Sequence, residues 1–327
     1  MHFISFDNIN FKKFYSRFLK SSVSSALYTF SDIQSLIEYR EEVEFTNKSV
    51  ILVEGKAPIL GILLTEHSDY NNIKNFTAFG RPIFYFEFPG VENNILNSAR
   101  KKLINYVNEQ LPAIKFNLIY VDYLIDNNLS SLSNNLIKKG LNPSPVYANL
   151  IDLRNDKSFL WLDIRKRHRK NIRWAEKNMS VKIFTSENCS MDVINLFKSM
   201  HIKSSGKQTR NNRTWEIQYE QIMNGEAYLV GGLINNEFVS FVFVNYINKI
   251  SYYYSGASDR TKFDKPINHR LIWEALLFSK ELGCHFFDMG EKIFNSKDEK
   301  LLSISNFKSG FTQQTAQRLE FNIKDSF

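Results

Sequence analysis

The residue with the clearest chemical potential is Lys308, which lies in the run Phe307–Phe311, FKSGF in one-letter code. An ammonium group held against an apolar wall stabilises a developing oxyanion far better than the same group does in water. The phenylalanines at the two ends of this run supply apolar surface. Lys308, with Phe307 beside it, is therefore a candidate for oxyanion stabilisation. The alternative is a surface lysine beside two core phenylalanines.

Two carboxylates earlier in the chain are candidates for proton transfer. Asp288 falls inside the apolar run Phe286–Gly290, and Glu291 follows that run directly. A carboxylate within a strand needs hydrogen-bond partners, because its desolvation is unfavourable. Asp288 therefore suits a base, an orienting acceptor or a structural anchor, and we prefer the structural role. Glu291 is expected to be more accessible and is a candidate proton acceptor.

A cation-rich helix is predicted from Phe159 to Asn178. Its apolar stripe is Ile164, His168, Ile172 and Ala175, and its other faces carry Arg165, Lys166, Arg167, Arg169, Lys170, Arg173 and Lys177. Like charges at this density repel one another, so contact with phosphate groups relieves a free-energy cost. The helix is either a surface that binds RNA or a nucleotide, through Arg165, Arg169 and Arg173, or a solvated face. His168 is interpreted as a core histidine.

The polar segment Lys207–Thr214 lies between two predicted helices and carries Arg213. Arg213 is expected just before a helix start, where the positive end of the helix dipole adds to its charge. This arrangement favours binding of an anion. An ordinary connecting loop is the alternative.

The elements that must position these residues occur twice along the chain. The first half has predicted strands at 49–54, 59–66, 83–88 and 116–124 and a helix at 93–110. The second half has strands at 227–234, 238–246, 250–255 and 284–289 and a helix at 266–282, with Asn235-Asn236 as a hairpin turn. The two helices even share their apolar spacing: Ala99, Leu103, Ile104 and Val107 correspond to Ile267, Leu271, Ile272 and Ala275. We infer a duplicated α/β unit; chance similarity of two ordinary α/β domains is the alternative.

Composition is consistent with two packed domains that have an anionic partner. The chain has 327 residues, of which 43% are hydrophobic, and a formal net charge of +8. Its two cysteines form no paired motif, which favours a reducing compartment. No run of about 20 apolar residues is present. We therefore expect a cytoplasmic protein with no transmembrane segment, divided into domains at 1–154 and 155–327.

Several catalytic motifs are missing from the sequence. It contains no phosphate-binding P-loop, no H-E-x-x-H, no G-x-S-x-G and no dinucleotide-binding G-x-G-x-x-G. Its six histidines are scattered without the spacing of metal ligands. Hydrolase triads, dehydrogenases, kinases and a metal site therefore lack support.

Residues 155–323 resemble the FemAB-type transferases, which add amino acids to peptidoglycan precursors, and their broader acetyltransferase-domain relatives. The resemblance rests on the order of several short motifs: Ser205-Gly206 followed by Arg213, the run Tyr252–Ala257, the run Gly283–Gly290, and Asn306–Phe311. Over 1–154 it is architectural only. It implies two tandem GNAT-like (acetyltransferase-like) domains of the α/β (α+β) class, each with a mixed, largely antiparallel, twisted sheet flanked by helices.

The resemblance also implies roles for particular residues. The pair that matches Phe307-Lys308 handles the acyl donor and stabilises the intermediate, and the arginine that matches Arg213 binds a nucleotide-linked acceptor. Tyr254 is expected to line the pocket. No motif locates the family's phosphate-binding lysine of the first domain, and Lys56 is taken as its candidate. The family's usual Asp-x-Gly-Gly is Asp288-Met289-Gly290-Glu291 here, a departure that affects acceptor geometry.

The donor and acceptor follow from these expectations. Acetyl-CoA enzymes cradle the pyrophosphate in a glycine-rich loop before a helix, but the equivalent segment Ser258–Pro266 contains no glycine. We therefore favour aminoacyl-tRNA as the donor over an acyl-CoA, with no bound cofactor and no DNA partner. The acceptor is expected to be an amino group of a nucleotide-linked muropeptide or amino sugar.

Two other functions remain open at this stage. One is an acyl-CoA-dependent N-acyltransferase that acts on an amino sugar of surface polysaccharide. The other is a non-catalytic RNA-binding or scaffold protein.

Overall fold

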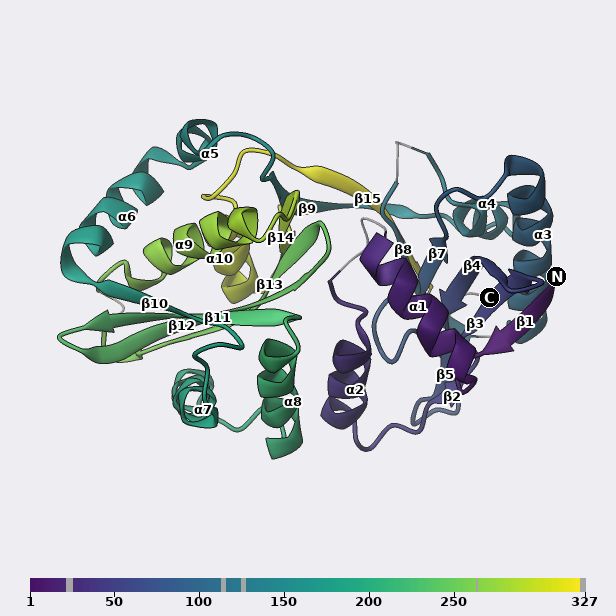
Figure 1. Cartoon of the computed structure of the whole chain (residues 1–327), viewed down its shortest axis with the longest axis horizontal. Helices are drawn as coiled ribbons and strands as arrows, with labels where there is room; N and C mark the ends of the chain where they lie inside the picture. Colours follow the sequence, from purple (N-terminus) through teal and green to yellow (C-terminus); the bar gives the residue numbers. More distant parts are fainter. Residues whose placement is uncertain (22–25, 113–115, 125–127, 263, 324–327) are drawn as a thin grey trace. The chain divides into compact units, whose positions relative to one another are not determined.

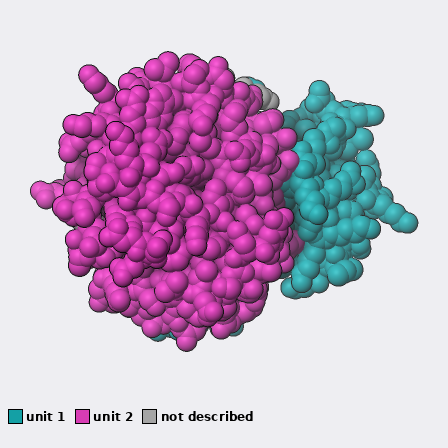
Figure 2. Space-filling view, turned by 60° about the vertical axis from the view of Figure 1, so that its left-hand side comes forward, with its two compact units in different colours: residues 1–22, 40–146, 317–327 teal, residues 23–39, 147–316 magenta. Residues whose placement is uncertain are grey.

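The protein's structure is a computed structural model that describes residues 1–21, 26–112, 116–124, 128–262 and 264–323 (Figure 1). Packing divides the chain into two compact units: unit 1 holds residues 1–22, 40–146 and 317–327, and unit 2 holds residues 23–39 and 147–316 (Figure 2). This division differs from the predicted one after Arg154 because α2 (Phe30–Tyr39) packs on α8 (Asn212–Met223) and because β15 (Ala316–Ile323) pairs with β8 (Phe116–Asp122). Two independently folding domains remain a prediction.

Unit 1 contains an antiparallel sheet of four strands in the order β1-β3-β4-β7. These strands are His2–Ser5, Val50–Glu54, Ala57–Leu63 and Phe84–Glu87. A second group has the order β15-β8-β6-β5-β2 and adds β6 (Lys74–Thr77), β5 (Thr65–Ser68) and β2 (Thr46–Asn47). The strand predicted at 59–66 is therefore two strands, because the chain passes from one group to the other at the buried Leu64.

The helices of unit 1 are α1 (Ile9–Ser21), α3 (Asn93–Gln110) and α4 (Ser131–Lys138). The predicted apolar stripe of α3 is confirmed for Ala99, Leu103 and Val107, which are buried against the sheet, while Ile104 lies at the edge of the core.

Unit 2 is built on strands in the order β10-β11-β12-β13-β14-β9. Their bounds are Ser180–Phe184, Ala227–Ile234, Glu237–Ile247, Ile250–Ser258, Phe286–Glu291 and Ser144–Asp152. Every neighbouring pair is antiparallel except β13 and β14, which are parallel. The predicted hairpin turn is confirmed: Asn235 and Asn236 have φ of 52° and 65°, the left-handed values that a two-residue hairpin loop requires.

Helices cover both faces of the unit 2 sheet (Figure 1). Helix α9 (Ile267–Glu281) packs on one face, where Val242 and Val244 of β12 point, and α6 (Lys166–Asn178) packs on α9. Helices α7 (Met191–Ser205) and α8 cover the other face, where Phe241 and Phe243 point. The alternation along β12 therefore separates two cores, one on each face. Helix α10 (Glu299–Lys308) follows β14.

The predicted cation-rich helix is wrong in one respect: it is two helices, α5 (Lys157–Asp163) and α6, with a break at Ile164 and Arg165. Both break residues have extended ψ values, and the backbone N–H of Arg165 donates to the carbonyl of Gly310 at 2.9 Å. This bond to another segment replaces the helical one. The predicted stripe is confirmed, since Ile164, His168, Ile172 and Ala175 are all buried.

No helix in the described part of the chain is both long enough and apolar enough to cross a bilayer.

Candidate active site

Strands β13 and β14 pair only over their first residues. The last pair in register is Tyr252 with Asp288; beyond it β13 pairs with β12 alone, and β14 continues beside β9. We call the point where the two strands stop pairing the fork. Ligands in open α/β sheets bind where neighbouring strands part at their carboxyl ends. The fork is therefore a candidate ligand-binding site.

A β-bulge in β13 lies next to the fork. Phe243 pairs with Ser255 and Val244 with Tyr253, so Tyr254 is an extra residue on that strand. A bulge re-aims the side chains around it. Tyr253 packs with the core on the α9 face, and Tyr254 packs with the core on the α7 and α8 face. The two adjacent tyrosines thus lie on opposite faces of the sheet, as successive strand residues do, and the bulge shifts the alternation after Tyr254.

Lys308, the last residue of α10, reaches the fork from the α9 face. Its Nζ lies 5.1 Å from the centroid of the Tyr253 ring, a cation–π contact. Burial lowers the pKa of the Lys308 ammonium below its usual value, and the negative charge of Asp288 opposes that shift. A partly desolvated cation near a carboxylate has the electrostatic setting that a catalytic lysine needs.

Asp288 and Gly290 of β14 lie at the fork. Asp288 is 3% exposed, and its Oδ1 accepts the backbone N–H of Gly290 at 2.7 Å. Gly290 has φ of 85°, and a Cβ there would lie 3.2 Å from the Tyr252 hydroxyl and 3.4 Å from Lys308 Nζ. A side chain is therefore disfavoured twice, by backbone strain and by crowding of the ammonium. Glu291 is exposed at the end of β14.

The turn that carries Lys308 is held by two histidines. The Nε2 of His168 lies 3.0 Å from the carbonyl oxygen of Phe307, and the rings of His168 and His269 are 4.6 Å apart. The Phe307 ring contacts both. Burial lowers the pKa of both imidazoles, that of His269 to about 4, so the pair is neutral near pH 7. His168 is a core histidine, as predicted, but its core position orients the active-site turn.

Other contacts fix the same turn. The Ser309 hydroxyl donates to the side-chain oxygen of Asn149 at 3.0 Å, and the Thr312 hydroxyl donates to Asp163 at 2.6 Å. Gly310 cannot carry a side chain, because a Cβ there would lie 2.1 Å from His168 Nε2.

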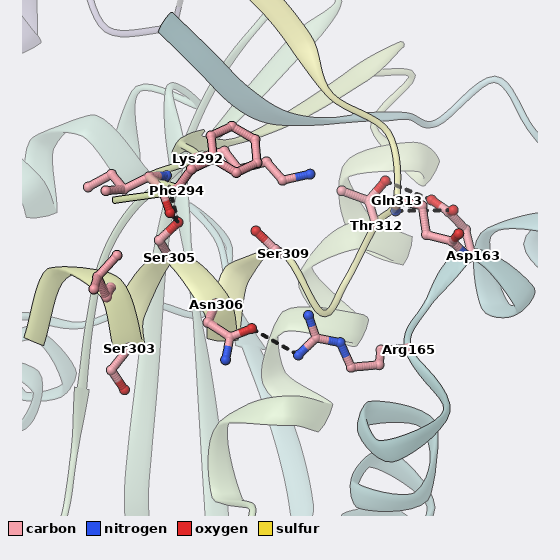
Figure 3. A pocket seen from close by; sticks show the side chains of 12 residues that line it. Asp163, Arg165, Lys292, Phe294, Ser303, Ser305, Asn306, Ser309, Thr312 and Gln313 are labelled. Carbon is pink, nitrogen blue, oxygen red and sulfur yellow. Dashed lines mark hydrogen bonds between the residues drawn. The ribbon is translucent and has the colours of Figure 1, made fainter. Parts of the chain in front are cut away.

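A polar pocket of about 910 Å³ lies beside this turn and is lined in part by Ser309 and Thr312. Figure 3 shows Arg165 pointing from the start of α6 toward Asn306 on α10, with Thr312 and Gln313 beside Asp163. Lys292, Phe294 and Ser309 complete much of the lining. Arg165 donates to the neutral Asn306 oxygen at 3.1 Å and so keeps its charge available to a ligand.

Sequence reasoning missed Arg210, which lies on the opposite face of β13. Its guanidinium is 5.2 Å from the Trp215 ring and 5.7 Å from the Tyr254 ring. Burial lowers its pKa, and within the described residues it makes no ion pair and its Nη1 has no hydrogen-bond partner. The buried indole N–H of Trp215 also has no partner there. Two buried donors without partners, one of them on an uncompensated positive charge, suit an anionic group.

Arg213 lies in a different setting from the one predicted. It is inside α8, not before it, because Asn211 is the N-cap and accepts the Thr214 N–H at 2.9 Å. Its guanidinium is paired with Glu216 at 3.1 Å and Glu220 at 2.7 Å. Its charge is already balanced, so Arg210 is the better candidate for binding an anion.

The remaining predicted residues are Arg169 and Arg173 of unit 2 and Lys56 of unit 1. Arg169 donates to the carbonyls of Trp161, Leu162 and Ile164 and so caps α5, and Arg173 stacks on the Trp161 ring at 5.5 Å. Lys56 is exposed in the turn between β3 and β4 of unit 1. In the described residues, no group of three His, Cys, Asp or Glu side chains is placed to hold a metal ion.

Comparisons with known proteins agree with this architecture. No protein-family model matches the sequence, and no curated protein matches it either. Among solved structures, FemX has a TM-score of 0.69 at 12% identity, with 99% of this chain and 98% of that chain covered. The C-terminal domain of a putative lysylphosphatidylglycerol synthetase from Agrobacterium fabrum has a TM-score of 0.60 at 7% identity, with coverages of 96% and 92%. L-PGS from Bacillus licheniformis has a TM-score of 0.55 at 10% identity, with coverages of 91% and 93%.

These likenesses define the class of fold. The chain has the mixed α/β fold of FemX over nearly its whole length. This fold was predicted from the motifs of the second half and from the repeated order of elements in the first.

Proposed function

We propose that this protein is an acyltransferase that moves an acyl or aminoacyl group from an activated ester to an amine. The observation that carries the proposal is the position of Lys308, which places a partly buried ammonium at the fork beside Asp288 and Tyr253. Attack of an amine on an ester carbonyl creates an oxyanion. A positive charge already held in a low-dielectric site stabilises that oxyanion more than it stabilises the neutral carbonyl.

The proton of the attacking amine needs an acceptor. Asp288 is buried and already accepts the Gly290 N–H, so we assign it an orienting role. Glu291 is exposed at the end of β14 and is the accessible carboxylate of the site. Proton transfer to Glu291 or to water leaves a neutral nitrogen on the tetrahedral carbon. The oxyanion then re-forms the carbonyl as the ester C–O bond breaks, and the leaving alkoxide takes a proton from Glu291 or from water. Much of the rate then comes from holding the two substrates in line, which converts a bimolecular reaction into a local one.

The acceptor is proposed to bind on the Arg210 side of β13. The Arg210 guanidinium and the Trp215 N–H suit a phosphate or carboxylate, and Tyr254 flanks them. A nucleotide-linked cell-envelope precursor supplies both an anionic handle and a free amine. The FemAB resemblance of the sequence points to the same class of acceptor.

Aminoacyl-tRNA is the proposed donor. The segment before α9, which would cradle a CoA pyrophosphate, has no glycine, and Pro266 at the N-cap makes no side-chain capping bond. Arg165 and Lys292, in contrast, bring two cations to the pocket beside the Lys308 turn. Single-stranded nucleic acid is bound by such cations together with exposed aromatic rings, and Phe294 is 67% exposed.

The test is a donor assay with purified protein. Aminoacyl-tRNA and an acyl-CoA are each incubated with a nucleotide-linked muropeptide, and transfer to the acceptor amine is followed by mass spectrometry. Transfer from charged tRNA supports the full proposal. Transfer from acyl-CoA alone keeps the acyltransferase but replaces its donor, and transfer from neither, across amine acceptors, contradicts the proposal.

A further inference from the structure

The outer surface of α5 and α6 has no part in the proposed reaction, yet it has an unusual composition. It combines two large exposed apolar side chains with a dense group of cations. Figure 1 shows α6 as the outermost layer of unit 2 above α9, so its free face is turned away from the sheet. This surface is in unit 2 alone, and we define it as the exposed residues of α5 and α6.

The apolar part consists of Phe159 and Leu162. Their side chains are 50% and 66% exposed, among the highest values for large apolar residues in the described chain. They are three residues apart on α5, so they lie on the same side of that helix. Leu160, on its other side, is buried in the core. Single exposed apolar residues are common, but an adjacent pair flanked by charges marks an interaction site.

The cationic part follows directly along the chain. The exposed cations are Lys157, Lys166, Arg167, Lys170, Arg173 and Lys177. Within the described residues, none of them makes an ion pair. Of the acids on these helices, Asp163 accepts hydrogen bonds from Thr312 and Gln313, which leaves Glu176 as the exposed carboxylate of α6. The surface is therefore strongly positive.

We propose that this surface docks on a lipid bilayer that carries anionic headgroups. Exposed apolar side chains next to a basic helix are the features of interfacial binding: the apolar groups enter the headgroup region, and the cations contact lipid phosphates. An RNA backbone satisfies the cations equally well, but it offers no favourable partner to the aliphatic Leu162. The exposed pair of Phe159 and Leu162 therefore favours a bilayer over RNA as the partner of this surface. The proposal concerns where the protein works and does not depend on the transfer reaction.

The experiment is co-sedimentation of the full chain with vesicles at fixed ionic strength. Vesicles of phosphatidylcholine with one-third phosphatidylglycerol are compared with vesicles of phosphatidylcholine alone. Wild type should bind the anionic vesicles and not the neutral ones. The double variant Phe159→Ser, Leu162→Ser should bind at least about tenfold more weakly, because two inserted side chains are lost. Replacing Lys166 and Lys170 with Gln should weaken binding by about fivefold per cation.

A matched control uses two apolar residues exposed on the other face of unit 2, Leu196 on α7 and Met223 on α8, which are 49% and 41% exposed. Leu196→Ser with Met223→Ser should leave vesicle binding unchanged, and a thermal melt shows that each variant is folded. The proposal is overturned if wild type ignores anionic vesicles, or if the Phe159 and Leu162 variant binds them like wild type. Loss of RNA binding in the charge variants, with no vesicle binding by wild type, assigns the surface to RNA instead.

Discussion

Lys308 and Arg210 lie on opposite faces of the sheet in unit 2, each against one of the adjacent tyrosines Tyr253 and Tyr254 of β13. Burial lowers the pKa of both cations, but their surroundings differ. Lys308 has the carboxylate of Asp288 nearby, whereas the charge interactions that favour the Arg210 cation come from two tyrosines. The surroundings of Lys308 suit a cation that takes part in the reaction, and those of Arg210 suit a cation that binds an anionic ligand.

Replacing Arg210 tests the binding side of this comparison and should give a larger effect than a change at Gly290. A hydrogen bond between charged groups is worth about 1.5–3 kcal/mol, so Arg210→Ala should raise the KM for an anionic acceptor by about 10- to 100-fold. Arg213→Ala removes only exposed ion pairs and should change KM little. Steady-state kinetics of both variants distinguish the two arginines. Equal effects would return the anion site to Arg213.

Gly290 tests the catalytic side. Gly290→Ala forces a side chain into a left-handed backbone position and within 3.4 Å of Lys308 Nζ, so turnover should fall by about tenfold. Gly283 is the matched control, because its φ is 80° and a Cβ there meets nothing within 4 Å. Both variants should lose about 1 kcal/mol of unfolding free energy. If Gly283→Ala reduces turnover as much, the contact with Lys308 is irrelevant.

The histidines behind the Lys308 turn are tested through stability. Burial lowers the pKa of His269 to about 4 in the folded state, while the unfolded chain titrates near 6.5. Between these values the unfolded chain binds more protons, so the free energy of unfolding falls as the pH drops from about 6.5 to 4. In His269→Gln, the free energy of unfolding should fall less between pH 6.5 and pH 4 than in wild type, by an amount on the order of 3 kcal/mol. Chemical denaturation at several pH values measures it.

The exposed His2 provides the control, and His2→Gln should keep the wild-type slope. An unchanged slope in the His269 variant would show that this buried pair does not limit acid stability.

The two sides also differ in how far the sequence predicted them. Phe307-Lys308 and Asp288-x-Gly290 are short runs that can be recognised in the sequence, and the structure brings them together at the fork. Their chemical roles stay predictions. Arg210 was missed because its role depends on rings from α8 and β13, far apart in sequence. One local signal was available: Asn211 with Thr214 three residues later is an N-cap pattern that puts Arg213 inside the helix.

The fold was predicted better than its details. Apolar periodicity located most strands of unit 2 and the stripes of α3, α6 and α9. The break between α5 and α6 was not visible, because it depends on a hydrogen bond from Arg165 to Gly310, far along the chain. The sequence also did not indicate that α2 packs with unit 2, because that packing depends on distant residues. The packing rests on the buried Asp32, which accepts hydrogen bonds from Gln221 and Asn245.

The most direct test of the account is single-turnover transfer by Lys308→Ala, with the donor identified by the assay above held at saturation. Loss of one oxyanion-stabilising group predicts a rate about 10²- to 10³-fold below wild type, with donor binding and thermal stability retained. Lys308→Arg, which keeps the charge but changes its geometry, should recover part of the rate. Full turnover by Lys308→Ala would contradict the central claim that the ammonium at the fork stabilises the reaction's negative charge.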